Sequence, residues 1–345
     1  MNIKKILIDK IKKNGSLNVA EFIKICQFEN GGYYLKNNPI GRDNDFITSP
    51  EISQMFGEVF TIFLINFWEK KIKNNFNLVE LGPGKGTLLN DILRTSSINQ
   101  KFLNSMHLTL IEKNKSLINI QKKNINHKNI TWCEKFDISN KKIPSIIYSN
   151  EFFDCFPVQQ YHKKEKWYEK YVNYNHVEQN FTLISQQVED EKILKSLEKF
   201  EQVKVAEIAR SRDEYFKLVC AFIKKHKGVF ITIDYGYKNP PDHLSLQTIY
   251  QHKKTHLFEN IGNQDITAHV NFNELISIAN EYNLKIETFC SQKDFLISYG
   301  IQERKKNLLK NKSVETIKKI NAEYDRLVDN SQMGEIFKVL VISCF

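Results

Sequence analysis

The chain has 345 residues and a formal net charge of +10, a length that allows one elaborated α/β core with insertions. Its lysines occur as scattered pairs typical of solvated surface, which disfavours a nucleic-acid partner. Its six cysteines include no Cys-x-x-Cys pair that would suggest zinc or redox chemistry, so we expect a reduced compartment. No apolar run is long enough to span a bilayer and no signal or transit peptide is evident, so we expect a cytoplasmic protein without membrane insertion, or a mitochondrial-matrix protein if its source is eukaryotic.

Residues 1–76 are predicted to form a helical region that packs on the core. Apolar residues at helical spacing predict two short helices before residue 30, broken near Gly15. A Gly- and Asn-rich loop over 31–44 follows. Thr48-Ser49-Pro50-Glu51 then predicts the start of a longer helix, because Ser or Thr caps a helix, Pro fits its first turn and Glu complements its dipole.

An apolar run ending in Glu80 leads into a turn that contains Gly82, Gly84 and Gly86. Glycine permits positive φ and close approach of a ligand, so the stretch predicts a strand, a ligand-binding turn and a helix. The spacing fits neither a dinucleotide fingerprint nor a Walker loop. It resembles motif I of S-adenosylmethionine (SAM) methyltransferases, where the acid lies near the methionine part of the ligand. A glycine-rich turn without a ligand is the alternative.

From residue 77 onward, short apolar runs alternate with helical or polar segments, which is typical of a parallel α/β sheet. We expect a core of 77–157 and 228–345, with strands at 78–81, 108–111, 130–133, 146–149, 229–233, 284–289 and 337–344.

Four of these strands are followed by an acid, namely Glu112, Asp137, Glu151 and Asp234. The carboxyl ends of parallel strands meet at one edge, so these acids should gather around the glycine turn. Glu112 suits the SAM ribose, because a carboxylate can accept two hydroxyl hydrogen bonds. Asp137 could accept from the adenine amino group; an ordinary loop carboxylate is the alternative.

Residues 158–227 are predicted to be an insertion. Aromatics alternate with charged residues in its first half and favour an amphipathic hairpin, with base stacking as the alternative. Helical patterns follow over 192–226. Beyond it, residues 236–269 form a loop long enough to be a binding lid.

The motif Asn150-Glu151-Phe152-Phe153-Asp154 occupies the position where methyltransferases place acceptor-binding groups. It lacks the paired prolines of enzymes that methylate base amino groups, which disfavours base methylation. Glu151 and Asp154 would suit a cationic acceptor such as arginine, by pairing with the guanidinium and orienting one nitrogen. Acids at a helix N-terminus are the alternative.

Histidines supply one further candidate. His269 could relay protons, although a structural role is the alternative. His252 and His256 have the i, i+4 spacing of a metal pair, but no third ligand is evident, so no metal site is assigned.

Six segments together carry a resemblance to a known family: residues 45–57, Val79 to Gly86, Asn150 to Asp154, Ile233 to Gly236, Asp265 to Phe272 and Met333 to Lys338. Through them the chain resembles the MidA family over nearly its whole length. The resemblance implies a class I SAM-methyltransferase (Rossmann-like) seven-stranded sheet with helical additions. It also implies SAM as cofactor, with Ser49, Pro50 and Asn150 beside it, and symmetric dimethylation of an arginine on a complex I subunit. Lys227 and Asn271 depart from the family's usual residues.

We therefore expect a SAM-dependent protein arginine methyltransferase with a protein substrate. A non-catalytic assembly factor that retains the fold and an RNA methyltransferase are the two rivals. The sequence leaves the acceptor, the number of methyl groups transferred and a homodimer open.

Overall fold

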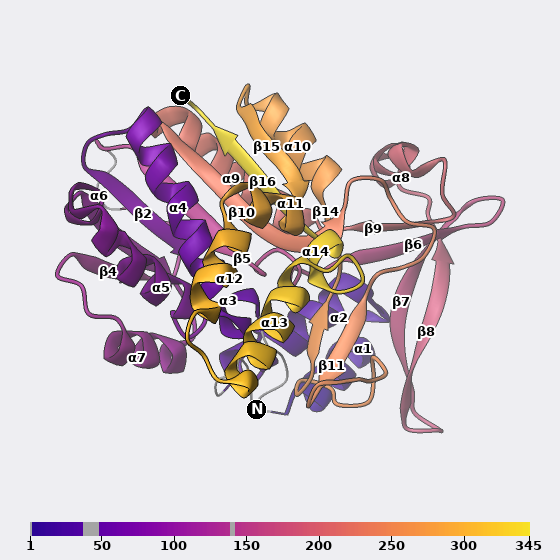
Figure 1. Ribbon diagram of the computed structural model, residues 1–345. Helices are drawn as coiled ribbons and strands as arrows, with labels where there is room; N and C mark the ends of the chain where they lie inside the picture. The colour runs from indigo at the N-terminus through magenta and orange to yellow at the C-terminus, as the bar shows by residue number, and fades with distance from the viewer. Residues whose placement is uncertain (1, 37–47, 139–141) are drawn as a thin grey trace.

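The computed structural model describes residues 2–36, 48–138 and 142–345. Most of the predicted loop over 31–44, and residues 45–47 of the first family motif, lie outside the described residues. The chain forms a main mixed sheet with helices on both faces, a second antiparallel sheet to one side, and a small three-stranded sheet (Figure 1).

The main sheet has the strand order β15-β16-β10-β5-β2-β3-β4, and β16 is antiparallel to both of its neighbours while the other pairs are parallel. A two-residue strand, β14 (Val270–Asn271), adds to β10. All seven predicted strands are therefore present, although β10 continues beyond its predicted end. The strands are β2 (Phe76–Leu81), β3 (Met106–Ile111), β4 (Ile130–Cys133), β5 (Ser145–Asn150), β10 (Gly228–Tyr237), β15 (Lys285–Ser291) and β16 (Phe337–Ser343).

Both faces of the main sheet are buried, because successive residues of a strand point to opposite sides. Leu78 packs with helices of one face, whereas the next residue, Val79, packs with helices of the other. The first face carries α4 (Gln54–Lys71), α5 (Thr87–Thr95), α6 (Gln100–Asn104), α11 (Gln292–Ser298), α12 (Ile301–Leu309) and α13 (Val314–Val328). The second face carries α9 (Arg210–His226) and α10 (Phe272–Glu281).

The two short N-terminal helices are confirmed as α1 (Ile3–Asn14) and α2 (Val19–Phe28). They pack on the second sheet and on the segment before β14, rather than on the main sheet. The longer predicted helix is divided into α3 (Ser49–Ile52) and α4, because Ser53 is extended and its hydroxyl accepts a hydrogen bond from the Met55 amide. The remaining helices are η1 (Tyr33–Leu35), η2 (Ser96–Ile98), α7 (Lys115–Asn124), α8 (Glu191–Leu197), η3 (Glu198–Phe200) and α14 (Met333–Ile336).

The second sheet has the order β1-β7-β6-β9, with β8 beside β7. It contains the predicted hairpin of alternating aromatics, which extends away from the main sheet in Figure 1. The helical patterns predicted over 192–226 are confirmed by α8 and α9, but the segment between these helices contains a strand, β9, which pairs with β6. The strands are β1 (Leu17–Asn18), β6 (Gln159–Lys163), β7 (Trp167–Asn175), β8 (Asn180–Gln187) and β9 (Val205–Ile208).

The segment predicted as a long loop over 236–269 contains a small sheet instead. Its strands are β11 (Gln247–Tyr250), β12 (Lys253–Lys254) and β13 (Asp265–Thr267), and β11 lies between the other two. Glu207 on β9 fixes the start of this segment, because its buried carboxylate accepts hydrogen bonds from the Ser245 amide and hydroxyl and the Leu246 amide. The second sheet therefore holds the small sheet in place.

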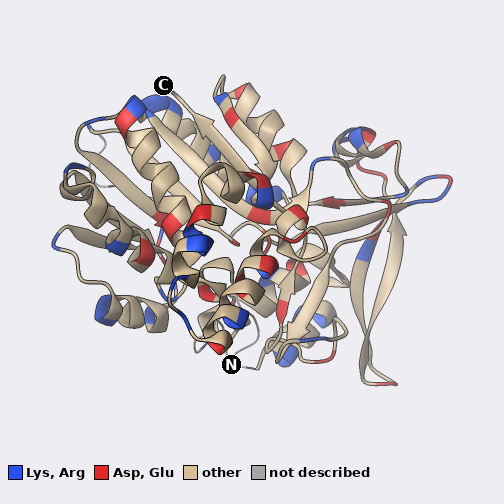
Figure 2. Cartoon of the chain, viewed as in Figure 1, with Lys and Arg blue, Asp and Glu red and all other residues tan. Residues whose placement is uncertain are grey.

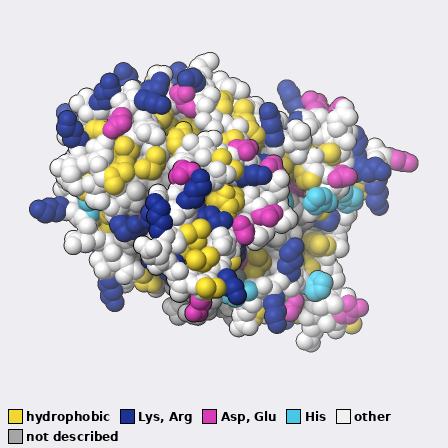
Figure 3. Space-filling view, in the orientation of Figure 1, with side chains coloured by type: hydrophobic (Ala, Val, Ile, Leu, Met, Phe, Trp, Pro, Cys, Tyr) yellow, Lys and Arg dark blue, Asp and Glu magenta, His cyan; other side chains and the backbone are white. Residues whose placement is uncertain are grey.

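Positive charge is distributed rather than concentrated. Lys and Arg occur on elements throughout the chain (Figure 2), and Figure 3 shows them mixed with Asp and Glu on the visible face. This mixed distribution is typical of solvated surface. Among the described residues, no helix is both long and apolar enough to cross a bilayer.

Candidate active site

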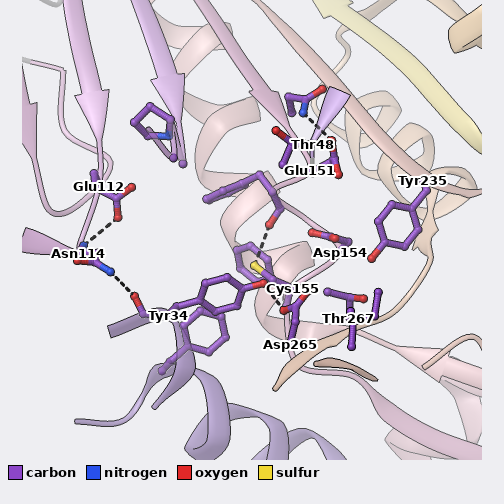
Figure 4. Close-up of a pocket in the computed structure, with 18 of the residues that line it drawn as sticks. Tyr34, Thr48, Glu112, Asn114, Glu151, Asp154, Cys155, Tyr235, Asp265 and Thr267 are labelled. Carbon is purple, nitrogen blue, oxygen red and sulfur yellow. Dashed lines mark hydrogen bonds between the residues drawn. The ribbon is translucent and has the colours of Figure 1, made fainter. Parts of the chain in front are cut away.

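A cavity of about 1420 Å³ opens where β2, β3, β5 and β10 end, and the small sheet forms part of its wall. It brings together nine of the predicted site residues, some of which Figure 4 shows facing one another. They are Pro50, Glu80, Gly82, Gly84, Glu112, Asn150, Glu151, Asp154 and His269.

The glycine turn forms one side of the cavity. Gly82 and Gly84 have φ of 65° and 55° and line the cavity directly. A Cβ at Gly82 would lie 2.7 Å from Phe152 Cδ2, so a side chain has no room there. Gly86, with φ of 82°, lies behind the lining and begins α5, where a Cβ would lie 2.7 Å from Ile125 Cδ1. Two glycines therefore border the ligand space, and the third shapes the turn.

Two carboxyl groups lie beside this turn. Glu80 is buried and accepts a hydrogen bond from Tyr148 Oη at 3.0 Å. Burial raises the pKa of Glu80 to about 8, and the charge of Glu112 contributes to the rise. Burial also raises the pKa of Glu112, whose carboxylate accepts a hydrogen bond from the Asn114 amide at 2.8 Å. The Asn114 side chain donates to the backbone of Tyr34, which connects this wall to the N-terminal region.

The predicted adenine contact at Asp137 is not supported. β4 ends at Cys133, and 134–136 form the cavity wall, whereas Asp137 is exposed and outside the lining. Ser49 is also outside the lining, because its amide donates to Glu151 Oε1 at 2.8 Å and its side chain is buried behind that carboxylate. It supports the site rather than bordering the cofactor space.

The residues present fit SAM. The glycine turn borders the cavity with backbone that carries no side chains. Glu80 and Glu112 provide acceptors for a cationic methionine part and for ribose hydroxyls. Among the described residues, the buried Oδ1 of Asn150 has no hydrogen-bond partner, and Asn150 lines the cavity. An acceptor left without a partner in the folded protein is a position for a ligand donor.

Glu80→Gln is expected to stabilise the ligand-free protein at pH 8 and to weaken SAM binding. The folded-state pKa lies above the unfolded value, so Glu80 costs stability increasingly as pH rises from about 4.5 to 8, by about 1.4 kcal/mol per unit. The amide can still accept the Tyr148 hydrogen bond without a charge. Thermal unfolding should show a melting temperature at least about 3 °C higher at pH 8. Calorimetry should show SAM affinity about tenfold lower. An unchanged melting temperature would contradict the buried charge.

The turn after β5 carries the candidate acceptor groups. Glu151 has φ of 49°, a left-handed conformation that costs energy for a residue with a side chain. Asp234 stabilises the turn, because its Oδ2 accepts hydrogen bonds from the Phe152, Phe153 and Asp154 amides at 3.1, 2.8 and 3.3 Å. The prediction that Asp234 lies at the rim was therefore wrong, since this carboxyl is fully buried beneath the turn.

Glu151 and Asp154 form a carboxyl pair in the cavity (Figure 4). Burial raises the pKa of Glu151 to about 7, and the negative charge of Asp154 contributes, while the Ser49 amide and Arg326 act in the opposite sense. Burial also raises the pKa of Asp154 above its ordinary value, against a hydrogen bond from Tyr235. Both groups can therefore change protonation near neutral pH.

His269 also lines the cavity, in the segment between β13 and β14. Its ring packs edge-on against Tyr235 at 5.5 Å, and burial lowers its pKa, so the imidazole is neutral at pH 7. Tyr235 therefore contacts both the histidine ring and, through a hydrogen bond, the carboxylate of Asp154. The proton relay remains a prediction.

Sequence reasoning did not select several residues that complete this end. Tyr34 donates to Asp265 Oδ1 at 2.6 Å, and Tyr235 and Thr267 lie beside Asp154 and Asp265 in Figure 4. Asp265 and Thr267 are two positions apart, as residues on the same face of a strand are, and this spacing could have indicated that both face the cavity. Tyr34 carried no such signal. Among the described residues, no group of His, Cys, Asp and Glu is placed to hold a metal ion.

Comparison with known proteins agrees with this geometry. A family model described as S-adenosyl-L-methionine-dependent methyltransferase matches residues 59–290. The mitochondrial protein arginine methyltransferase NDUFAF7 of Mus musculus is 30% identical over 365 residues, covering 96% of this chain and 82% of that protein. Its counterpart from Danio rerio is 29% identical, covering 98% and 86%.

The fold is also shared with a solved structure. A protein from Burkholderia thailandensis, crystallised with S-adenosyl-homocysteine, superimposes with a TM-score of 0.87 at 19% identity and covers 99% of this chain and 92% of its own. The glycine turn, the strand-end carboxyl groups and the extent of the matches lead to one conclusion. This chain belongs to the S-adenosyl-L-methionine-dependent methyltransferase family.

Proposed function

We propose that this SAM-dependent methyltransferase methylates an arginine of a protein, and that the acceptor protein is a subunit of respiratory complex I. The names of the relatives support protein arginine as the acceptor. The relatives are designated mitochondrial, which supports an acceptor in the compartment that contains complex I if the source is eukaryotic; in a bacterium the acceptor would lie in the cytoplasm. The complex I assignment rests on the family resemblance of the sequence motifs.

The observation that carries the proposal is the buried pair of Glu151 and Asp154. Two carboxyl groups removed from water favour a cationic ligand, because each ionised form needs a compensating charge. A guanidinium matches two carboxylates with its fork of N–H donors. A neutral acceptor would leave both groups without that compensation.

The chain's own residues would orient the acceptor and receive its proton. When bound, SAM supplies the methyl group. Glu151, fixed through Oε1 by the Ser49 amide, presents its other oxygen to the guanidinium. Arginine is a poor nucleophile because its pKa exceeds 12, so orientation and charge stabilisation must lower the barrier. The nitrogen that gains a methyl group loses a proton, and a carboxylate with a pKa near 7 suits that transfer.

Labelling the protein's own cell extract with radioactive SAM tests the proposal. We expect one protein band to be labelled and its acid hydrolysate to contain symmetric dimethylarginine. Label in RNA or in small molecules only would reject the proposal and favour the RNA rival. Absence of label, together with full cellular function of a Glu151→Gln variant, would favour the non-catalytic assembly factor.

A further inference from the structure

One face of the small sheet lines the cavity beyond the carboxyl pair. The strand register places Asp265 of β13 opposite Ile249 of β11, and Ile249 opposite Lys254 of β12. Thr267 lies opposite Gln247 in the same way. All five side chains line the cavity, so they form one continuous face, here called the inner face.

The inner face changes character from one edge to the other. Asp265 is buried, accepts a hydrogen bond from Tyr34 and lies near Asp154 (Figure 4). Ile249 in the middle is apolar, and Lys254 at the far edge is exposed and positively charged. A ligand that covers this face would therefore meet negative charge, then an apolar strip, then positive charge.

The cavity is also larger than a single small ligand requires. Pockets for such ligands typically measure about 300–1,000 Å³, whereas this one measures about 1420 Å³. The inner face is part of the cavity wall, so the cavity extends beyond the carboxyl pair and leaves room for a length of polypeptide next to the acceptor side chain.

The spacing of the strands fixes the pattern of charges on that polypeptide. Neighbouring strands lie about 4.8 Å apart, so two steps from β13 to β12 span about 10 Å. An extended chain advances about 3.3 Å per residue, so this distance corresponds to about three residues, and side chains that face the same side are separated by an even number of positions. We propose that the acceptor segment lies extended across the inner face, with an acidic side chain two or four residues from the methylated arginine paired with Lys254. This inference rests on the proposed arginine activity.

Lys253 supplies a matched control. It precedes Lys254 on the same short strand, is also exposed, and does not line the cavity. Lys253→Glu and Lys254→Glu make the same change of net charge on opposite faces of β12. A difference between the two variants therefore reports the inner face rather than overall charge.

The test uses nine-residue peptides with a central arginine and with Glu, Gln or Lys two or four positions before or after it. Fluorescence anisotropy measures their binding to the full-length protein saturated with S-adenosylhomocysteine. In at least one of these four positions, the Glu peptide should bind about fivefold more tightly than the Lys peptide, the factor an exposed ion pair supports. Lys254→Glu should reverse this order, and Lys253→Glu should leave it unchanged. Higher salt should reduce the preference.

Equal binding of the three peptides, no binding of any peptide, or equal effects of the two variants would overturn the inference. The same peptides incubated with labelled SAM test the proposed activity separately. Charge-selective binding without methylation of the arginine would contradict the arginine activity and leave the inner face as a peptide-binding surface.

Discussion

Replacing Glu151 with Gln is expected to lower kcat/KM for an arginine acceptor about a thousandfold, the loss seen when a preorganised electrostatic contact is removed. The substitution keeps the shape of the side chain and an oxygen that can accept the Ser49 hydrogen bond, but removes the charge that would pair with the guanidinium. SAM binding should change less than threefold, because Glu151 lies at the acceptor end. Calorimetry and initial rates measure the two effects separately.

The same carboxyl group predicts a pH profile. With a pKa raised to about 7 by burial, Glu151 is ionised above that pH and neutral below it. Since the ionised form is required to bind a cation, kcat/KM for the wild-type protein should fall about tenfold per unit as pH decreases below 7. The Glu151→Gln variant should lose the fall that begins near pH 7 and keep only a fall at lower pH, where Asp154, whose pKa burial raises to about 6, becomes protonated.

The exposed Glu189, remote from the cavity lining, provides the control. Glu189→Gln should retain wild-type rates and the wild-type pH profile. A Glu151→Gln variant that also retained them would contradict the role of the carboxyl pair.

The main sheet could be predicted from sequence because each of its strands is a short apolar run between helical or polar segments. The glycine turn could be predicted because its backbone conformation leaves a direct trace in residue type: Gly82 and Gly84 both have positive φ. The position of Glu112 and Glu151 at the cavity could be predicted because each directly follows a parallel strand, and the carboxyl ends of parallel strands meet at one edge of the sheet. The same rule failed for Asp137, since a few residues of loop after β4 are enough to turn a side chain out of the lining.

Other features depend on contacts between distant parts of the chain. The hydrogen bond from Tyr34 to Asp265 joins residues 231 positions apart, and no local pattern indicates it. The small sheet leaves no clear local pattern in the sequence, because its strands are only two to four residues long and the segment is held by Glu207 of the second sheet. The sequence predicts Asp234 at the rim because an acid ends the strand there. It does not show that the amides of Phe152, Phe153 and Asp154, in the turn above, donate hydrogen bonds to this carboxylate and hold it beneath them.

Replacing Gly82 with Ala is expected to weaken SAM binding at least about a hundredfold. The added Cβ would lie 2.7 Å from the ring of Phe152, which packs against Phe153, Phe156 and Tyr215 at centroid distances of 5.3–5.5 Å and has little freedom to move. Either the ring or the turn must shift, and the turn borders the ligand space. Positive φ at this residue adds a cost of roughly 1–2 kcal/mol for any L side chain.

Gly300 separates the two effects, because it also has positive φ, of 92°, but a Cβ there meets nothing within 4 Å and it lies outside the cavity lining. Gly300→Ala should therefore lower the unfolding free energy by roughly 1–2 kcal/mol without changing SAM affinity. Gly82→Ala should lower both. Thermal unfolding and calorimetry on the two variants measure the comparison. If Gly82→Ala bound SAM as tightly as Gly300→Ala, close approach of the ligand to this turn would be contradicted, because the strain of positive φ is common to both.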